Sequence, residues 1–191
     1  MVLRSHATRR AALCLAGLLA ALGALAWAPG ARAQKASLEY AVKATYLYKF
    51  APFVTWPAGA FAVPSEPLWL CIQGDDPFGP IIDRAVAGQS VGGRPIALRR
   101  LRVIDSQSRC HILYLAGSAR QGIAEALAAV DDRPVLTVTD AAIDPNVKGI
   151  VHFVVHDNRV RFEIDDYAAW QHGLTISSRV LSLAVAVRPR P

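Results

Sequence analysis

The chain of 191 residues contains little cysteine and methionine, with three Cys and one Met. Only Cys71 and Cys110 follow residue 33, and neither has a Cys or His partner at the short spacing of a metal site, so we predict no metal. A Gly-Lys-Ser/Thr phosphate loop and a Gly-x-Ser-x-Gly nucleophile motif are also missing. Asp165-Asp166 is better explained as the start of a helix than as a catalytic pair. We therefore predict a protein that is not an enzyme and has no cofactor.

The basic charge of the chain is concentrated at its start. Four of the 21 Lys and Arg residues precede residue 34, and all 15 acidic residues follow it, which leaves 17 basic and 15 acidic residues and a net charge of +2. Beyond that point the only basic cluster is Arg99-Arg100-Arg102, which we assign to a solvated strand end. Without an aromatic-interleaved basic face, the sequence predicts no binding of nucleic acid.

The first 33 residues have the three parts of a secretory signal peptide. Arg4, Arg9 and Arg10 form a basic start, residues 11–28 carry no charge, and Ala31-Arg32-Ala33 supplies small residues for cleavage. A retained membrane anchor is the alternative, because about 18 apolar residues approach the spanning minimum of roughly 20. We predict cleavage after Ala33 and export to the periplasm without a membrane anchor. Arg9-Arg10 also fits a twin-arginine signal loosely, so the export route stays open.

The remaining residues 34–191 predict a single α/β domain. Apolar periodicity predicts helices at residues 38–50, 80–87, 118–129 and 167–172, with a last helix capped by Ser177 or Ser178 and apolar through residue 187. Strands are expected at residues 68–72, 96–98, 110–115 and 135–138, and residues 150–155 and 159–164 form a β-hairpin. Helices that alternate with strands predict a layered mixed sheet flanked by helices, with a C-terminal β-hairpin.

The two remaining cysteines favour a disulfide between Cys71 and Cys110, because an even count is typical of exported proteins. Closing a loop of about forty residues would stabilise the fold by roughly 4 kcal/mol in the chain-entropy model. The alternative is two buried thiols packed as small apolar groups. In simple parallel register the two residues would lie several positions apart along the strands, so the bond requires a shifted register or an irregular start at Cys110.

Three segments together resemble a known family. The first is KATYLYKF at residues 43–50 running into FVTWP at 53–57, the second is VLTVTD at 135–140, and the third is RVRFEID at 159–165 followed by GLTISSRVLSLA at 173–184. Their order and spacing are similar to those of the YfiR-like family of periplasmic proteins, over about residues 38–187. The chain departs from the usual pattern at Pro52, Asp165 and residues 148–151.

The resemblance implies a periplasmic repressor that binds the periplasmic sensor domain of a membrane diguanylate cyclase. It further implies control of cyclic-di-GMP and biofilm formation, a redox input and a homodimer. We place the partner surface around Arg161, Phe162 and Glu163, together with Ile176 and Arg179 of the segment 176–179. In the alternative arrangement Phe162 faces the core while Arg161 and Glu163 are solvated. The alternative function is a periplasmic small-molecule-binding module with its ligand near the strand ends.

Overall fold

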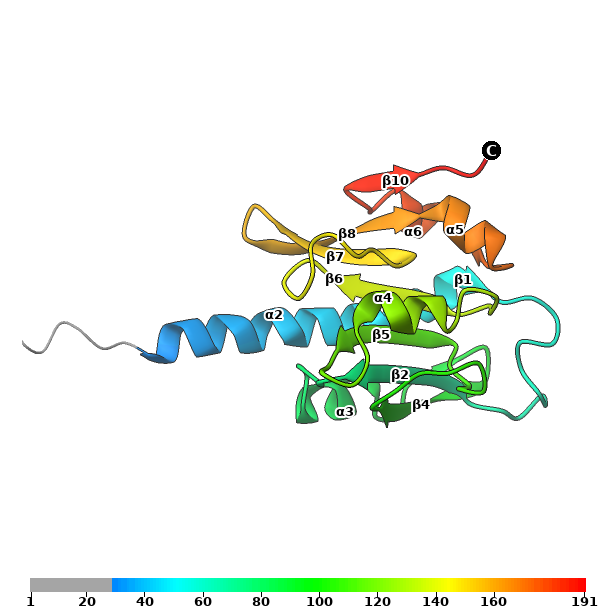
Figure 1. The fold of residues 1–191 in the computed structure, drawn as a ribbon, viewed down its shortest axis with the longest axis horizontal. Coiled ribbons are helices and arrows are strands. Elements are labelled where there is room, and N and C mark those ends of the chain that lie inside the picture. The colour runs from blue at the N-terminus through cyan, green and yellow to red at the C-terminus, as the bar shows by residue number, and fades with distance from the viewer. Residues whose placement is uncertain (1–28) are drawn as a thin grey trace, which may run out of the picture. The chain divides into compact units, whose positions relative to one another are not determined.

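The computed structural model describes residues 29–191 (Figure 1). The chain divides into two units, residues 1–36 and 37–191, and the second contains the fold. Most of the predicted signal peptide lies outside the described residues, and its cleavage stays a prediction. Helix α2 (Pro29–Phe50) ends where Pro52 was expected to end it, and the 3-10 helix η2 (Ala51–Phe53) follows. Among residues 29–191, none of the helices has the length and apolar character that a bilayer span requires.

The core of the second unit is an eight-stranded mixed sheet in the order β10-β8-β7-β6-β5-β2-β4-β3. Strands β4, β2, β5, β6 and β7 run parallel, and β10 is parallel to β8. Strands β7 and β8 form the predicted hairpin, in which Asp157 and Asn158 adopt positive φ in the connecting turn. The strand bounds are β2 (Leu68–Gly74), β3 (Ser90–Val91), β4 (Arg94–Leu101), β5 (Ile112–Gly117), β6 (Leu136–Asp140), β7 (Val151–His156), β8 (Arg159–Asp165) and β10 (Ala186–Arg188).

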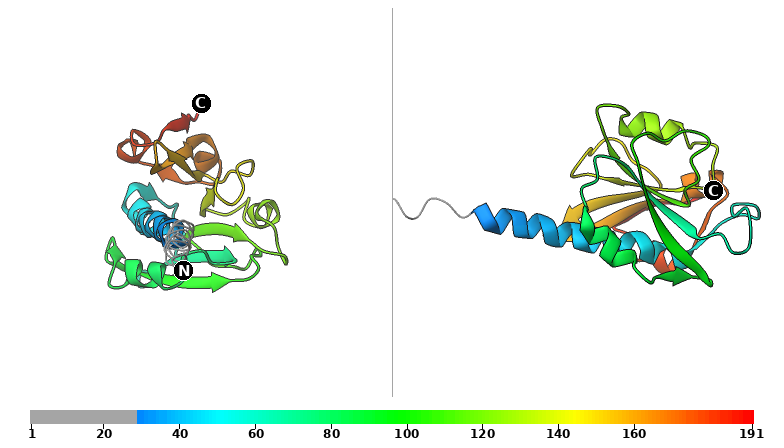
Figure 2. Two further views of the ribbon diagram at one scale, coloured as in Figure 1. Left: turned by 90° about the vertical axis from the view of Figure 1, so that its left-hand side faces the viewer. Right: turned by 90° about the horizontal axis from the view of Figure 1, so that it is seen from below.

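Helices cover the two faces of this sheet (Figure 2). Residues 37–50 of α2, with α3 (Pro80–Val86), α5 (Asp166–Gln171) and α6 (Ser178–Leu181), pack on one face around a large aromatic and aliphatic core. Helix α4 (Ile123–Ala128) lies on the opposite face over a smaller cluster that includes Cys71, Cys110 and Leu113. A separate antiparallel pair joins β1 (Val54–Thr55) to β9 (Thr175–Ile176). The predicted fold class, a mixed sheet flanked by helices with a hairpin, is confirmed.

Three predicted helix bounds were wrong, and the first is the start of α2, which was expected at residue 38 but lies at Pro29. The helix expected from Ser118 begins at Ile123, because residues 118–122 form a loop in which Ser118 N donates to Gln121 O. The last helix is capped by Ser177 as expected but ends at Leu181, and the chain then turns into β10. Short strands β1, β3, β9 and β10 were not predicted, because two or three residues carry too little periodicity to be detected.

Candidate functional site: the disulfide pocket and the C-terminal surface

Cys71 and Cys110 form the predicted disulfide, with their Cα atoms 5.8 Å apart. In the β2–β5 register Cys71 lies opposite Leu113. Cys110, which bonds to Cys71, comes three residues before Leu113 in the chain. The bond forms because the chain before β5 is irregular, and His111 N there donates to Trp69 O. Cys71 is fully buried and Cys110 is 7% exposed, and both belong to the core cluster beneath α4.

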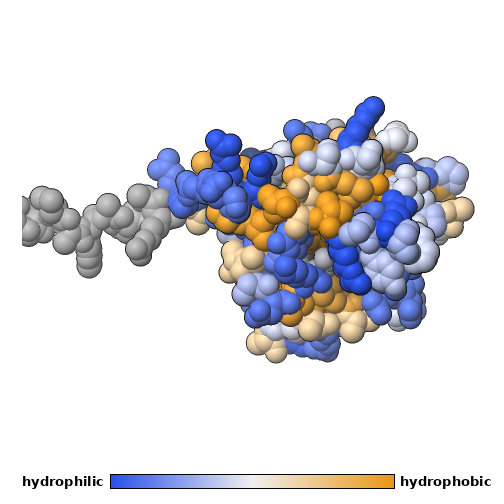
Figure 3. Space-filling model, turned by 90° about the horizontal axis from the view of Figure 1, so that it is seen from above, coloured by the Kyte–Doolittle hydropathy of each residue, from blue (hydrophilic) through white to orange (hydrophobic). Residues whose placement is uncertain are grey.

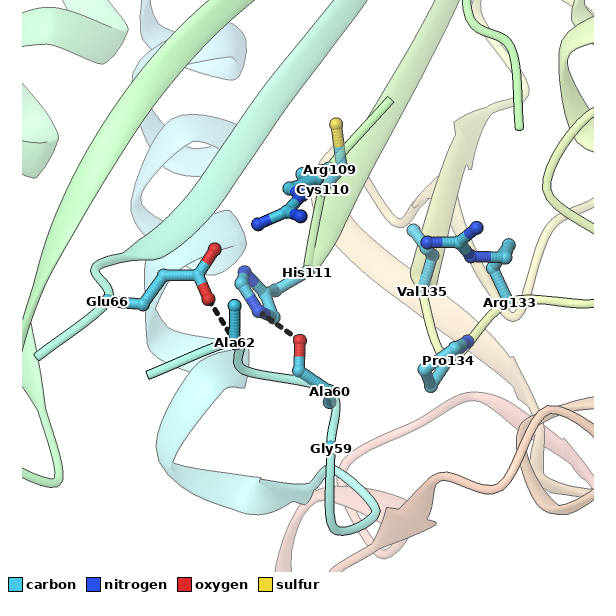
Figure 4. A pocket seen from close by; sticks show the side chains of 10 residues that line it. All are labelled: Gly59, Ala60, Ala62, Glu66, Arg109, Cys110, His111, Arg133, Pro134 and Val135. Carbon is cyan, nitrogen blue, oxygen red and sulfur yellow. Dashed lines mark hydrogen bonds between the residues drawn. The ribbon is translucent and has the colours of Figure 1, made fainter. Parts of the chain in front are cut away.

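A pocket of about 340 Å³ lies beside the disulfide and is lined by Cys110 (Figure 4). His111 contributes to the same wall, where Nδ1 accepts from Trp69 N at 3.0 Å and Nε2 lies 3.2 Å from Ala60 O. Burial lowers the pKa of His111, so the ring is neutral at pH 7. Cys110 is the more exposed cysteine of the bond, and it is the one that borders this pocket.

Charged side chains surround this pocket on several sides (Figure 4). Arg109 and Arg133 lie on different walls, and Arg133 Nη1 donates to Ser106 O at 2.7 Å. The hydrogen bond from Ala62 N lowers the pKa of Glu66, which also accepts from the Trp69 indole. The pocket can therefore hold a small polar molecule. Its lining contains the Glu66 carboxylate as well as the two arginines, so the charges there are of both signs.

The structure separates the residues that we predicted as a partner surface. Phe162 is 2% exposed, and its ring packs 5.1 Å from Phe50. Ile176 is also buried and pairs with Val54 in the β1–β9 ladder. Arg161, Glu163 and Arg179 remain at the surface. The alternative arrangement, with Phe162 in the core and Arg161 and Glu163 solvated, is the one that the strand alternation produces.

Glu163 lies on the face of the sheet opposite to Phe162, beside the edge strand β10. Its carboxylate accepts from Lys148 Nζ at 2.6 Å, and both residues line a hollow of about 340 Å³ with His152 and Arg188. Burial lowers the pKa of His152, whose Nδ1 lies 2.8 Å from the Thr139 hydroxyl. This hollow combines a mostly apolar lining with the Lys148–Glu163 ion pair, and Arg179 on α6 lies outside it.

An exposed apolar surface lies on the α2 side of the sheet edge. We define the C-terminal patch as Leu38 and Val42 of α2 with Leu183, Val185 and Val187, which are 67%, 37%, 60%, 41% and 37% exposed. Val185 N donates to Phe162 O, and the Phe162 ring packs 5.4 Å from Tyr46 of α2, so both segments border strand β8. Figure 3 shows apolar side chains gathered on this face. Exposed apolar groups of this kind mark interaction surfaces.

A buried polar cluster fixes α2, and so the patch, against the sheet. Lys43 is fully buried and donates to Asp140 Oδ2 at 2.6 Å and to Glu39, while the Tyr114 hydroxyl donates to Asp140 at 3.0 Å. Burial opposes the charge on Lys43, but the hydrogen bonds to Asp140 and Glu39 outweigh it and raise the Lys43 pKa. Burial likewise raises the pKa of Tyr114. The cluster is therefore a fixed ion pair at physiological pH.

Sequence reasoning missed both the patch and this cluster. We predicted an apolar helix through Leu183 and Val187, although Leu183, Val185 and Val187 alternate with period two, which is the signal of a strand. Lys43 lies between apolar positions of α2 and four residues after Glu39, a spacing that indicates an ion pair but not a buried one.

Comparison with known proteins agrees with this arrangement. A family profile described as YfiR/HmsC-like matches residues 40–185, and this range contains every strand of the large sheet except β10. A search of curated proteins returned no match. Among the described residues, no group of three or more His, Cys, Asp or Glu side chains could hold a metal ion. Because the family profile matches more than half of the chain, the chain belongs to the YfiR/HmsC-like family, whose members are periplasmic, non-catalytic regulators of cyclic-di-GMP signalling.

Proposed function

We propose that this protein binds the periplasmic sensor domain of an inner-membrane diguanylate cyclase and represses the enzyme, thereby limiting cyclic-di-GMP and biofilm formation. The observation that carries the proposal is the C-terminal patch, which exposes five large aliphatic side chains, two of them on the helix that the Lys43–Asp140 pair anchors. Repression requires that the protein bind the inactive state of the sensor more tightly than the active state, because only this difference shifts the equilibrium.

The patch is the main contact in this proposal, and the charged residues flank it. Arg179 of α6 belongs to the same C-terminal segment and provides a solvated margin. Arg161 and Glu163 lie on the other face of the sheet and form a second, charged surface beside Lys148. An interface usually combines an apolar centre with a polar rim, and the patch with Arg179 fits that pattern.

Capture of the cyclase by surface variants tests this assignment. Leu183→Lys/Val185→Lys should reduce capture of the membrane cyclase at least tenfold and raise cellular cyclic-di-GMP, since two charges would be buried in the interface. Val63→Lys/Val103→Lys makes the same change at two exposed aliphatic residues outside the patch, which are 52% and 48% exposed. This control should capture the cyclase normally. Undiminished capture by the patch variant, with wild-type circular dichroism, would reject the patch.

Glu163→Lys separates the two faces of the sheet. If the charged surface beside β10 is the contact instead, this variant loses capture while the patch variant keeps it. Lys148 pairs with Glu163 at the surface, and exposed pairs contribute about 0–1 kcal/mol, so the variant should fold. The proposal expects capture by Glu163→Lys to change less than threefold.

Redox control and self-association complete the proposal. Reduction of the Cys71–Cys110 bond removes a cross-link from the core under α4, and we expect reduced protein to repress the cyclase less strongly. The comparison is cyclase capture by oxidised protein and by a Cys71→Ala/Cys110→Ala variant at equal concentration. Sedimentation equilibrium of the wild type tests for the homodimer that the family resemblance implies. A monomer at micromolar concentration would reject the homodimer.

A further inference from the structure

The order of the parallel strands reverses between β2 and β5. After β2 the chain crosses through α3 to β4 on one side, and β5 then lies on the other side of β2. Helix α3 contributes Ile82 and Val86 to the core on the α2 face, whereas α4, which follows β5, lies on the opposite face. In open sheets of this kind, ligands bind outside the carboxyl ends of the strands at the point of reversal.

A cavity of about 350 Å³ occupies this position and is called the switch-point pocket below. Gly74 and Asp75 enter it at the end of β2, and Arg102 enters it after β4. Residues 118–120, which complete the lining, follow β5 directly. The pocket therefore draws on three neighbouring strand ends, and its residues come together only because β4, β2 and β5 are adjacent in the sheet.

Buried side-chain amides hold the wall of this pocket in place. Gln121 exchanges two hydrogen bonds of 2.8 Å with the backbone of Ile104, and Gln73 Nε2 lies 3.3 Å from Gln121 Oε1. Gly117 N donates to Gln73 Oε1. Gly74 and Gly117 approach so closely that a Cβ atom at Gly74 would lie 2.1 Å from Gly117 O. A wall fixed in this way loses little conformational freedom when a ligand binds.

The charges of the pocket are free for a ligand. Arg102 and Arg120 are exposed, and within residues 29–191 neither guanidinium forms an ion pair or a hydrogen bond. Neighbouring Arg100 differs, because it pairs with Asp76 at 2.7 Å and with Asp83 at 2.6 Å. Asp76 is thereby neutralised and also accepts from Phe78 N. Only the Asp75 carboxylate opposes the two guanidiniums, so the pocket is net positive.

We propose that the switch-point pocket binds a small organic anion, with a carboxylate or phosphate group that accepts hydrogen bonds from Arg102 and Arg120. Hydrogen bonds from guanidinium to such a group are charge-assisted and roughly twice as strong as bonds between neutral groups. The site lies at the strand ends and not on the C-terminal patch, so the proposal does not depend on the cyclase as partner. It gives the protein a place to bind a soluble metabolite.

Titration of the ¹⁵N-labelled protein tests this proposal directly. The probes are sodium acetate, glycerol 1-phosphate and uncharged glycerol, followed through the backbone amides of residues 117–121. Arg102→Ala/Arg120→Ala removes the two guanidiniums. Arg84→Ala/Arg159→Ala removes the same charge from exposed positions outside the pocket and serves as the matched control.

We expect a saturable shift with at least one acid, weakened tenfold or more in Arg102→Ala/Arg120→Ala and less than twofold in the control. Acetate as the better probe identifies a carboxylate ligand, and glycerol 1-phosphate identifies a phosphate ester. The proposal is overturned if neither acid shifts these amides, if glycerol shifts them equally, or if both double variants lose affinity to the same extent.

Discussion

Substitution of Lys43 by Met tests how α2 is held on the sheet. Lys43 is fully buried and donates to Asp140, whose side chain is 1% exposed, whereas its second partner, Glu39, is 22% exposed and can return to water. Without Lys43, the Asp140 carboxylate keeps only neutral donors, the Tyr114 hydroxyl and Ala142 N. Removal of one member of a buried ion pair costs roughly 3–5 kcal/mol, because the other charge stays buried. We expect Lys43→Met to lower the free energy of unfolding by about that amount.

Urea unfolding followed by tryptophan fluorescence, with the disulfide intact, measures this loss. Asp140→Asn in the Lys43→Met background removes the buried charge while keeping an acceptor for Tyr114, and it should recover about 2 kcal/mol. Lys49→Met changes an exposed lysine of the same helix and should stay within about 0.5 kcal/mol of the wild type. A loss below about 1 kcal/mol for Lys43→Met, or a further loss on adding Asp140→Asn, would refute the reasoning.

Three further predictions concern the disulfide, a buried histidine and a glycine contact. Cys71→Ala/Cys110→Ala, which removes a bond of sequence separation 39, should lower the free energy of unfolding by about 4 kcal/mol in urea titrations. Burial lowers the pKa of His111 below 6.5, so its contribution to stability is present above about pH 6.5 and is lost as pH falls below that value. Gly74→Ala should cost more than about 2 kcal/mol, because the new Cβ would meet Gly117 O at 2.1 Å.

Each of these three predictions has its own control measurement. For the disulfide, wild type in reductant should unfold at the same urea concentration as the double variant, and a difference above about 1 kcal/mol would show that sulfur packing dominates. In unfolding titrations from pH 7 to pH 5, the free energy of unfolding should depend less steeply on pH in His111→Gln than in the wild type. An equally steep dependence would contradict the contribution assigned to His111. Gly92→Ala, where φ is +57° and the space is open, should cost only about 1 kcal/mol.

The order of the elements was predictable because each long segment carries its own signal. The apolar run 68–72 reads as a strand covered on both faces, and its residues 68 and 70–72 are buried in β2. Pro52 marks the end of α2, and Asp165 caps α5 through a bond from Ala168 N, as its position before Tyr167 suggested. These are local effects of backbone geometry and burial, so one sequence is enough to find them.

The same local signals could not show that α2 and the C-terminal segment both border strand β8. Leu38 and Leu183 lie 145 positions apart, and no periodicity relates them. Likewise, Lys43 and Asp140 carry no mark of pairing in the sequence, because their contact depends on α2 crossing the carboxyl end of β6. Such contacts depend on how distant segments are placed against each other in the fold. The residue pattern within one segment does not reveal that placement.

The exposed patch and the buried ion pair are consequences of one arrangement. Helix α2 is apolar around much of its circumference, so the side that packs on the sheet cannot be identified from hydropathy alone. Lys43 resolves this ambiguity, because its only buried charged partner is Asp140. This pairing turns Ala44 and Leu47 toward the core and leaves Val42 at the surface. The orientation of the proposed binding face is thus set by an ion pair on the other side of the helix. A variant that weakens this pair should therefore weaken cyclase capture even though it changes no residue of the patch.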